Sequence, residues 1–245
     1  MRTALLLCAL LLPSASAQWT QADLLNRVLD LDRLTQAPRP GERPLLFSSY
    51  DRRQGQVQNG RYAHWDGEQD AGQFYGKDQG WDILADATGP GIVHRIWVDQ
   101  PRGQFRLEID GRIVYEDAFR ALFDGSLEPF GKPLSYFAED KGTGANLYFP
   151  IGFAQRFRLL TRNFDGRYQV DASQHPQRSI QSFRPQLSDP SVEALDRVVS
   201  AFRNGLQDKH VLAGRSTMTV AWQQDVEPGG KAVETFDEGG GKGGF

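Results

Sequence analysis

The sequence predicts a mainly β protein, a β-sandwich with two flanking helices. Many short apolar stretches of strand length alternate with turn residues, which is typical of sandwiches and barrels. Aromatic residues make up 11 % of the chain, and phenylalanine is the commonest of them, which suits packing on a pleated surface. Two other stretches have the apolar spacing of an amphipathic helix.

The first predicted helix spans residues 20–35, with Thr20 as its N-cap and Asp23 at the capping-box position. The second spans residues 190–204, with Asp189 as its N-cap. Each has apolar residues along one face, so each is expected to pack on a sheet.

The predicted strands lie mostly between these helices. They cover residues 81–84, 92–98, 105–109, 145–149, 156–161, 168–171, 217–222 and 231–235. Asp110-Gly111 follows the third strand as a strong hairpin turn. Residues 55–60 are predicted as a polar loop, and residues 117–131 as a loop with one helical turn.

Length and charge limit the classes of function. With 245 residues the chain can form one large domain or two small ones. Its net charge is −3 and it has no basic tract, so nucleic acid is not an expected partner.

The N-terminus is typical of a secretory signal. Residues 4–12 form an apolar core that is too short to cross a bilayer, and Ala15-Ser-Ala17 is a small-residue cleavage site before Gln18. A buried N-terminal strand is the alternative, but the apolar run does not alternate. We expect residues 1–17 to be removed on export to the periplasm or the cell exterior, leaving no membrane attachment.

Neither a metal nor a cofactor is predicted. The one cysteine, Cys8, belongs to the signal, and the histidines lack the spacing of a zinc site. Asp66, Glu68 and Asp70 alternate, yet the calcium-loop spacing is absent, so a solvated acidic loop is the simpler interpretation. The histidines are His64, His94, His175 and His210.

One polar motif suits binding of a sugar. Phe47-Ser-Ser-Tyr-Asp-Arg-Arg53 places Tyr50, Asp51 and Arg52 in succession, which provides an aromatic face, an acceptor and a five-donor fork. Arg52 could donate to hydroxyl groups, Asp51 could accept from them, and Tyr50 could stack on the ring. The alternative is that Asp51 and Arg52 pair with each other and cap a loop.

A second motif, Thr88-Gly-Pro-Gly-Ile-Val-His-Arg-Ile-Trp97, is a turn followed by a strand. Strict alternation would point one set of side chains to each face. The sets are Ile92, His94 and Ile96 on one face, and Val93, Arg95 and Trp97 on the other. Trp97 and Trp65 could provide platforms for a sugar, although a tryptophan in a strand more often belongs to the core.

In this order the two motifs resemble the signature of the DUF2961 family, which is grouped with glycoside hydrolase family 172. Later blocks are also similar to that family, and they cover residues 29–34, 105–111, 146–151 and 168–171. The resemblance implies a jelly roll, the first half of a double jelly roll. It also favours Tyr50, Asp51, Arg52 and Trp97 as substrate-binding residues.

The family further implies a retaining hydrolase of furanosides, such as difructose dianhydrides or arabinofuranosides, with a glutamate nucleophile and a glutamate acid/base. The family's two glutamate blocks are of the types Gly-Glu-Gly-Asp-Asp and Gly-Thr-Gly-Thr-Glu-Asp-Tyr-Phe, and neither occurs here. Residues 142–149 resemble the second, but Ala145 and Asn146 supply no carboxylate. We therefore assign no catalytic residue.

The predicted organisation is that of an N-terminal portion. The segments are a signal at 1–17, a helix and linker at 18–44, a jelly roll at 45–225 with the helix 190–204 inserted, and the start of a second β-domain at 226–245. The family implies a furanoside substrate and a homo-oligomer, trimer or hexamer, and this chain is expected to be inactive alone. The alternatives are a flexible glycine-rich tail and a complete non-catalytic module for carbohydrate binding or assembly.

Overall fold

A computed structural model describes residues 18–204, except 32, 34–35, 39, 53–56, 59–60, 63–66, 68 and 139–143. The predicted signal, the strands predicted after residue 205 and the boundary at residue 226 lie outside these residues. Within the described part, no helix is both long and apolar enough to cross a bilayer.

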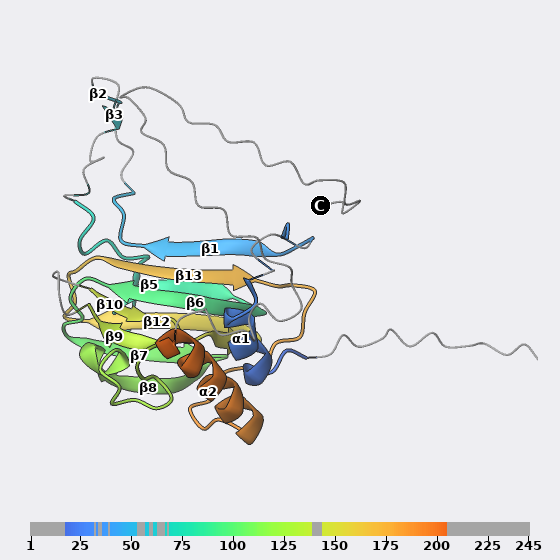
Figure 1. The fold of residues 1–245 in the computed structure, drawn as a ribbon. Coiled ribbons are helices and arrows are strands. Elements are labelled where there is room, and N and C mark those ends of the chain that lie inside the picture. The colour runs from blue at the N-terminus through green and yellow to red at the C-terminus, as the bar shows by residue number, and fades with distance from the viewer. Residues whose placement is uncertain are drawn as a thin grey trace, which may run out of the picture. The chain divides into compact units, whose positions relative to one another are not determined.

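Two antiparallel sheets face each other as a β-sandwich (Figure 1), which confirms the predicted fold class. The first sheet has the order β1-β13-β6-β10-β9, with β11 also pairing with β6. Its strands are β1 (Arg43–Ser48), β6 (Gly91–Val98), β9 (Ser135–Phe137), β10 (Ala145–Leu147), β11 (Ile151–Phe153) and β13 (Tyr168–Gln174).

The second sheet has the order β4-β5-β12-β7-β8. Its strands are β4 (Lys77–Asp78), β5 (Trp81–Thr88), β7 (Gln104–Ile109), β8 (Arg112–Ala118) and β12 (Arg156–Arg162). The short strand β2 (Val57–Gln58) replaces part of the polar loop predicted at residues 55–60, and its partner β3 (Arg61–Tyr62) follows that segment. A 3-10 turn at Phe119–Leu122 confirms the predicted helical turn.

The core fills the space between the sheets, where strands from both contribute buried aromatic and aliphatic side chains. Examples are Phe105 and Phe157 of the second sheet and Phe153 and Val170 of the first. The turn at residues 89–90 carries the chain from β5 in the second sheet to β6 in the first. A Cβ on Gly91 would overlap the Phe153 ring and approach the Ser173 carbonyl to 2.7 Å, so only glycine fits there.

A β-bulge in the pairing of β13 with β6 overturns the expected alternation along the second motif. Two consecutive residues of β13 pair with Arg95 and with Val93 of β6, which leaves His94 between them as the extra residue. Val93 and Ile96 consequently both belong to the main core, whereas Ile92 packs in a separate cluster outside the sandwich. Strict alternation was wrong because a bulge adds a residue to one strand.

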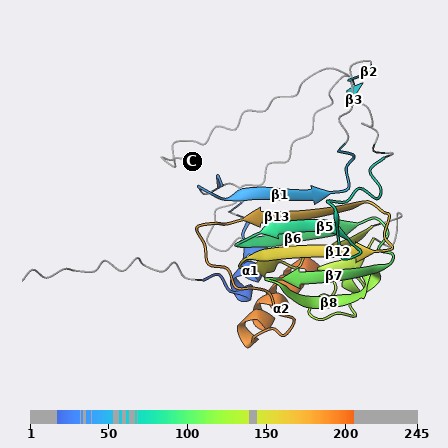
Figure 2. The same cartoon turned by 180° about the vertical axis from the view of Figure 1, so that it is seen from behind.

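Two helices lie side by side on one side of the sandwich (Figures 1 and 2), α1 (Gln21–Val28) and α2 (Asp189–Asn204). The Leu24 side chain of α1 packs with Ile92 and Ile180. The capping box of Thr20 and Asp23 is present as predicted.

Both predicted helix boundaries need correction. The first helix ends at Val28 instead of residue 35, and tight turns follow, in which the Leu29 and Asp30 N–H groups bond to carbonyls three residues earlier. Asp30 lies just beyond this end, and an acidic residue is unfavourable at a helix C-terminus, which accounts for the helix ending before residue 35. At the start of α2, the Ser191 N–H donates to the Ser188 carbonyl at 2.9 Å, and Asp189 is already helical.

The predicted strands correspond to β5, β6, β7, β10, β12 and β13, and most of them are longer than predicted. The strands β9 and β11, which have three residues each, carry no separate signal in the sequence.

Candidate functional site

The two ends of the sandwich present different groups. At the signature end, β1 finishes at Ser48 opposite Gln169 of β13, and the Tyr50-Asp51-Arg52 motif follows. At the hairpin end, the Asp110-Gly111 turn between β7 and β8 lies beside the turn between β11 and β12, because Asp110 donates its N–H to the Arg156 carbonyl at 2.8 Å.

Arg52 lies in an aromatic cluster at the signature end. Its guanidinium carbon is 3.8 Å from the centroid of the Tyr75 ring and 4.8 Å from that of Tyr50, and it donates a hydrogen bond to the Ser48 carbonyl. The Tyr75 hydroxyl accepts a hydrogen bond from the Ser48 N–H at 3.2 Å. These contacts fix the turn that follows β1.

The electrostatics of this cluster favour a charged Arg52. Burial by itself lowers its pKa, but hydrogen bonds and charge interactions with Tyr75 and Tyr168 outweigh burial, so the pKa is raised. The Tyr168 ring is buried and its hydroxyl donates to the Gln73 carbonyl at 3.0 Å. Tyr50, in contrast, is 54 % exposed, so its ring is open to a ligand.

Asp51 is held through its backbone, since its N–H donates to the Asp70 carboxylate at 2.8 Å. That hydrogen bond fixes the backbone position from which the Asp51 side chain extends. It also gives Asp70, predicted as part of a solvated acidic loop, a structural partner.

Trp97 lies on the outer face of the first sheet. Gln169 of β13 is its register partner, and Gln169 is also the partner of Ser48, so Trp97 is two strands, or roughly 10 Å, from the end of β1. No contact found among the described residues joins Trp97 to Arg52. Trp65 lies outside the described residues.

An outer-face patch surrounds Trp97, and we define it as Arg95, Trp97, Tyr136, Tyr148, Gln169 and Asp171. Arg95 bonds to Gln169 at 3.3 Å and pairs with Asp171 at 3.5 Å. The rings of Tyr136 and Tyr148 stack with their centroids 6.4 Å apart. The patch therefore combines flat apolar rings with fixed donors and acceptors.

The carboxylates on the second sheet are held by arginines. Arg158 pairs with Asp78 at 2.6 Å and with Glu108 at 2.9 Å, and Arg156 pairs with Asp86 at 2.6 Å. These carboxylates therefore serve as ion-pair partners of arginines on the second sheet.

Metal binding finds no support in the described residues, which contain no group of three or more histidine, cysteine, aspartate or glutamate side chains able to hold an ion.

A polar chain that sequence reasoning missed joins Glu42, His175, Ser173 and His94. The Glu42 carboxylate is 3.4 Å from His175 Nδ1, His175 Nε2 is 2.7 Å from Ser173 Oγ, and Ser173 Oγ is 2.6 Å from His94 Nε2. The sequence does contain one indication of this chain: Ser173 and His175 are two residues apart, and residues with that spacing in a strand lie on the same face.

This chain has the order carboxylate, imidazole, hydroxyl that activates a nucleophilic serine. However, the cavities beside it are lined by His175 on one side and His94 on the other, and Ser173 lines neither. Burial lowers the pKa of His175, and burial together with His175 lowers the pKa of His94 to about 4. Two neutral histidines bridged by a hydroxyl fit a structural clasp between β13, β6 and the Glu42 segment.

Comparison with known proteins identifies the domain. The model of the GH172 first beta-sandwich domain matches residues 40–191, which is more than half of the chain. No curated protein matches the chain. The matched residues contain the whole sandwich, the aromatic cluster of Arg52 and the outer-face patch. The chain therefore belongs to glycoside hydrolase family 172, of which it carries the first β-sandwich domain.

Proposed function

We propose that this chain is the first-domain portion of an exported, retaining glycoside hydrolase that acts on furanosides, with fructofuranoside or arabinofuranoside linkages. Family membership and the exposed Tyr50 ring beside the Arg52 fork carry the proposal. In this proposal Tyr50 stacks on the sugar, and Arg52 and Asp51 contact its hydroxyl groups.

The catalytic carboxylates are not supplied by the described residues in this proposal. Retaining hydrolysis needs two carboxyl groups about 5 Å apart, one of them protonated at the start of the reaction. Among the described residues, the cavities lined by Asp110, by Glu42 and by Asp99 each contain a single carboxylate. The two family glutamates would come from a second β-domain, and neighbouring subunits of a trimer or hexamer would complete the site.

Activity assays test this proposal. The 245-residue chain should not hydrolyse arabinofuranoside or difructose dianhydride substrates, whereas a longer protein with both glutamate blocks should. General acid catalysis alone contributes roughly 10²–10⁴-fold, so its loss is easily measured. Turnover by the short chain that disappears after a change in one of its own glutamates would contradict the proposal.

Substitutions in the longer protein test the site residues. Asp51→Asn should weaken transition-state binding by about 1–3 kcal/mol with an unchanged melting temperature, because the amide keeps the shape of the side chain but loses the charge that strengthens its hydrogen bonds to substrate hydroxyl groups. Tyr50→Ala should raise KM. If both variants lost activity only in proportion to thermal stability, Tyr50 and Asp51 would have structural roles alone.

The outer-face patch favours a second candidate, a non-catalytic carbohydrate-binding module. Flat aromatic rings beside fixed polar groups suit a saccharide chain lying across a sheet. If this is correct, the 245-residue chain should bind furanoside oligosaccharides, and Trp97→Ala should abolish that binding while Tyr50→Ala leaves it intact. The opposite pattern would favour the first proposal.

A further inference from the structure

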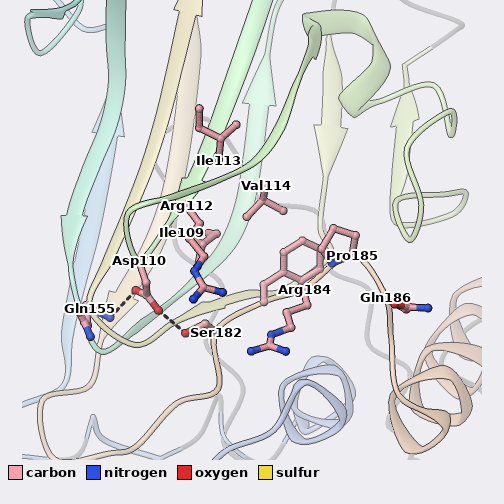
Figure 3. Close-up of a pocket in the computed structure, with 11 residues that line it drawn as sticks. Ile109, Asp110, Arg112, Ile113, Val114, Gln155, Ser182, Arg184, Pro185 and Gln186 are labelled. Carbon is pink, nitrogen blue, oxygen red and sulfur yellow. Dashed lines mark hydrogen bonds between the residues drawn. The ribbon is translucent and has the colours of Figure 1, made fainter.

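A large cavity lined by described residues lies at the hairpin end, far from the signature motif. It measures about 740 Å³, within the range of ligand sites, and lies between the Asp110 turn, the start of β8 and residues 182–186. Figure 3 shows the side chains of both bordering segments around this space.

Two arginines give the cavity its charge. Arg112 at the start of β8 and Arg184 in the 182–186 segment both line it, and both are exposed. Neither one forms an ion pair or hydrogen bond with an acidic residue among the described residues, although most arginines of the second sheet are paired. Figure 3 shows the Arg112 guanidinium between the turn and residues 182–186, and the Arg184 guanidinium projecting from that segment.

The one carboxylate in the cavity is already fully bonded. Asp110 accepts hydrogen bonds from the N–H groups of Ala154, Gln155 and Arg156 at 3.3, 2.7 and 2.9 Å, and from the Ser182 hydroxyl. Burial raises its pKa, but the Ser182 and backbone hydrogen bonds outweigh burial and lower it. Asp110 is therefore a structural anion, and the two arginines keep their donors for a ligand.

The rest of the lining is mixed. Ile113, which is 55 % exposed, and Pro185 offer an apolar wall, while Gln155 and Gln186 offer amide groups at its border. A guanidinium fork binds a carboxylate bidentately. A ligand that matches all of these groups has a carboxylate, hydroxyl groups and an apolar face.

We propose that this cavity is a binding site for a carboxylate-bearing saccharide of the uronide class. Arg112 and Arg184 bind the carboxylate, the glutamine amides bind hydroxyl groups, and the C–H face of the sugar packs on Ile113 and Pro185. The site lies at the opposite end of the sandwich from Tyr50 and Arg52, so it can bind a charged polysaccharide independently of the proposed catalytic site.

Calorimetric titration of the 245-residue chain tests the site with trigalacturonate, its methyl ester and inorganic phosphate. Trigalacturonate should bind, the ester should bind about tenfold more weakly or not at all, and phosphate should bind more weakly than trigalacturonate because it cannot use the apolar wall. Equal binding of acid and ester, phosphate binding as tight as trigalacturonate, or no binding at 10 mM (roughly the weakest affinity worth calling a site) would overturn the proposal.

Variants locate the binding. Arg112→Gln and Arg184→Gln should each weaken trigalacturonate binding about tenfold without changing the melting temperature, because neither side chain has an acidic partner among the described residues. Arg43→Gln is the matched control, since Arg43 is an exposed arginine on β1 outside the cavity, and its affinity should stay within about twofold. An equal loss in the Arg43 variant, or no loss in the other two, would show that the cavity is not the site.

Discussion

The two ends of the sandwich use arginine in opposite ways. At the signature end, Arg52 lies against the rings of Tyr50 and Tyr75 and bonds to the Ser48 carbonyl. At the hairpin end, Arg112 and Arg184 border a cavity of about 740 Å³, and Asp110 takes its hydrogen bonds from backbone groups and a serine. In the recognisable motif, Arg52 therefore largely stabilises the fold. At the other end, which has no distinctive motif, the charges of Arg112 and Arg184 remain available for a ligand.

This difference shows why a sequence motif does not by itself locate a binding site. A guanidinium that packs on aromatic rings stabilises the fold, and only the donors that remain can bind a ligand. An arginine without a partner adds little to stability, so its charge is available for binding.

The largest expected loss of stability concerns the close packing around Gly91 at the hairpin end. Gly91→Ala should destabilise the protein by about 3 kcal/mol, because the new Cβ would overlap the Phe153 ring and the Ser173 carbonyl. Urea denaturation measures the change. Gly131→Ala is the control and should change stability by less than about 0.5 kcal/mol, since a Cβ there meets no atom within 4 Å. Equal losses of stability in the two variants would mean that the structure around Gly91 adjusts to the added Cβ.

The next largest expected effect concerns Asp110, whose hydrogen bonds join the turn between β7 and β8 to the turn between β11 and β12. Asp110→Asn should cost about 2 kcal/mol at pH 7, because an amide loses the charge and one acceptor for the surrounding N–H groups. The folded pKa is depressed, so the carboxylate stabilises the fold above its unfolded pKa, and this contribution is lost as pH falls through the folded pKa. The difference in stability between the wild-type protein and this variant should thus shrink in acid. Asp117→Asn, at an exposed position, is the control and should change stability by less than about 0.5 kcal/mol at pH 7.

A pair of arginine variants compares the two ends directly. Arg52→Ala should lower the free energy of unfolding by about 1–2 kcal/mol, through loss of the ring contacts and of the bond to Ser48. Arg112→Ala should change it by less than about 0.5 kcal/mol. Thermal and urea unfolding measure both changes, and a larger loss for Arg112 would reverse the comparison.

Much of the fold could be predicted from local patterns. Strand periodicity, the Asp110-Gly111 turn and the Thr20 capping box depend on neighbouring residues, and the structure contains all three. The bulge at His94 could not be predicted, because it depends on how β13 pairs with β6. The short strands β9 and β11 exist only because a partner strand is present.

The site was less accessible to sequence reasoning. The sequence identified Tyr50, Asp51 and Arg52 by residue type, but not that Tyr75, from a distant loop, would lie against Arg52. The cavity of Arg112 and Arg184 joins segments about seventy residues apart. The polar chain of Glu42, His175, Ser173 and His94 joins three segments, which are β6, the end of β13 and the residues before β1. Such groupings follow from tertiary packing, and no local spacing encodes them.

The smallest effect concerns the histidine clasp and tests whether the hairpin end is also the pH-sensitive one. The folded pKa of His94 is lowered to about 4, first by burial and then by His175, while Arg27 and Arg33 act in the same direction. The unfolded chain binds more protons between about pH 6.5 and 4, so this contribution to stability is present above pH 6.5 and lost as pH falls toward 4. His94 keeps an exposed edge, so solvent screens part of the effect. Urea denaturation across this range should show a smaller acid loss for His94→Gln, which keeps a donor for Ser173 but cannot titrate. An identical pH profile for the variant would show that the clasp does not respond to protonation.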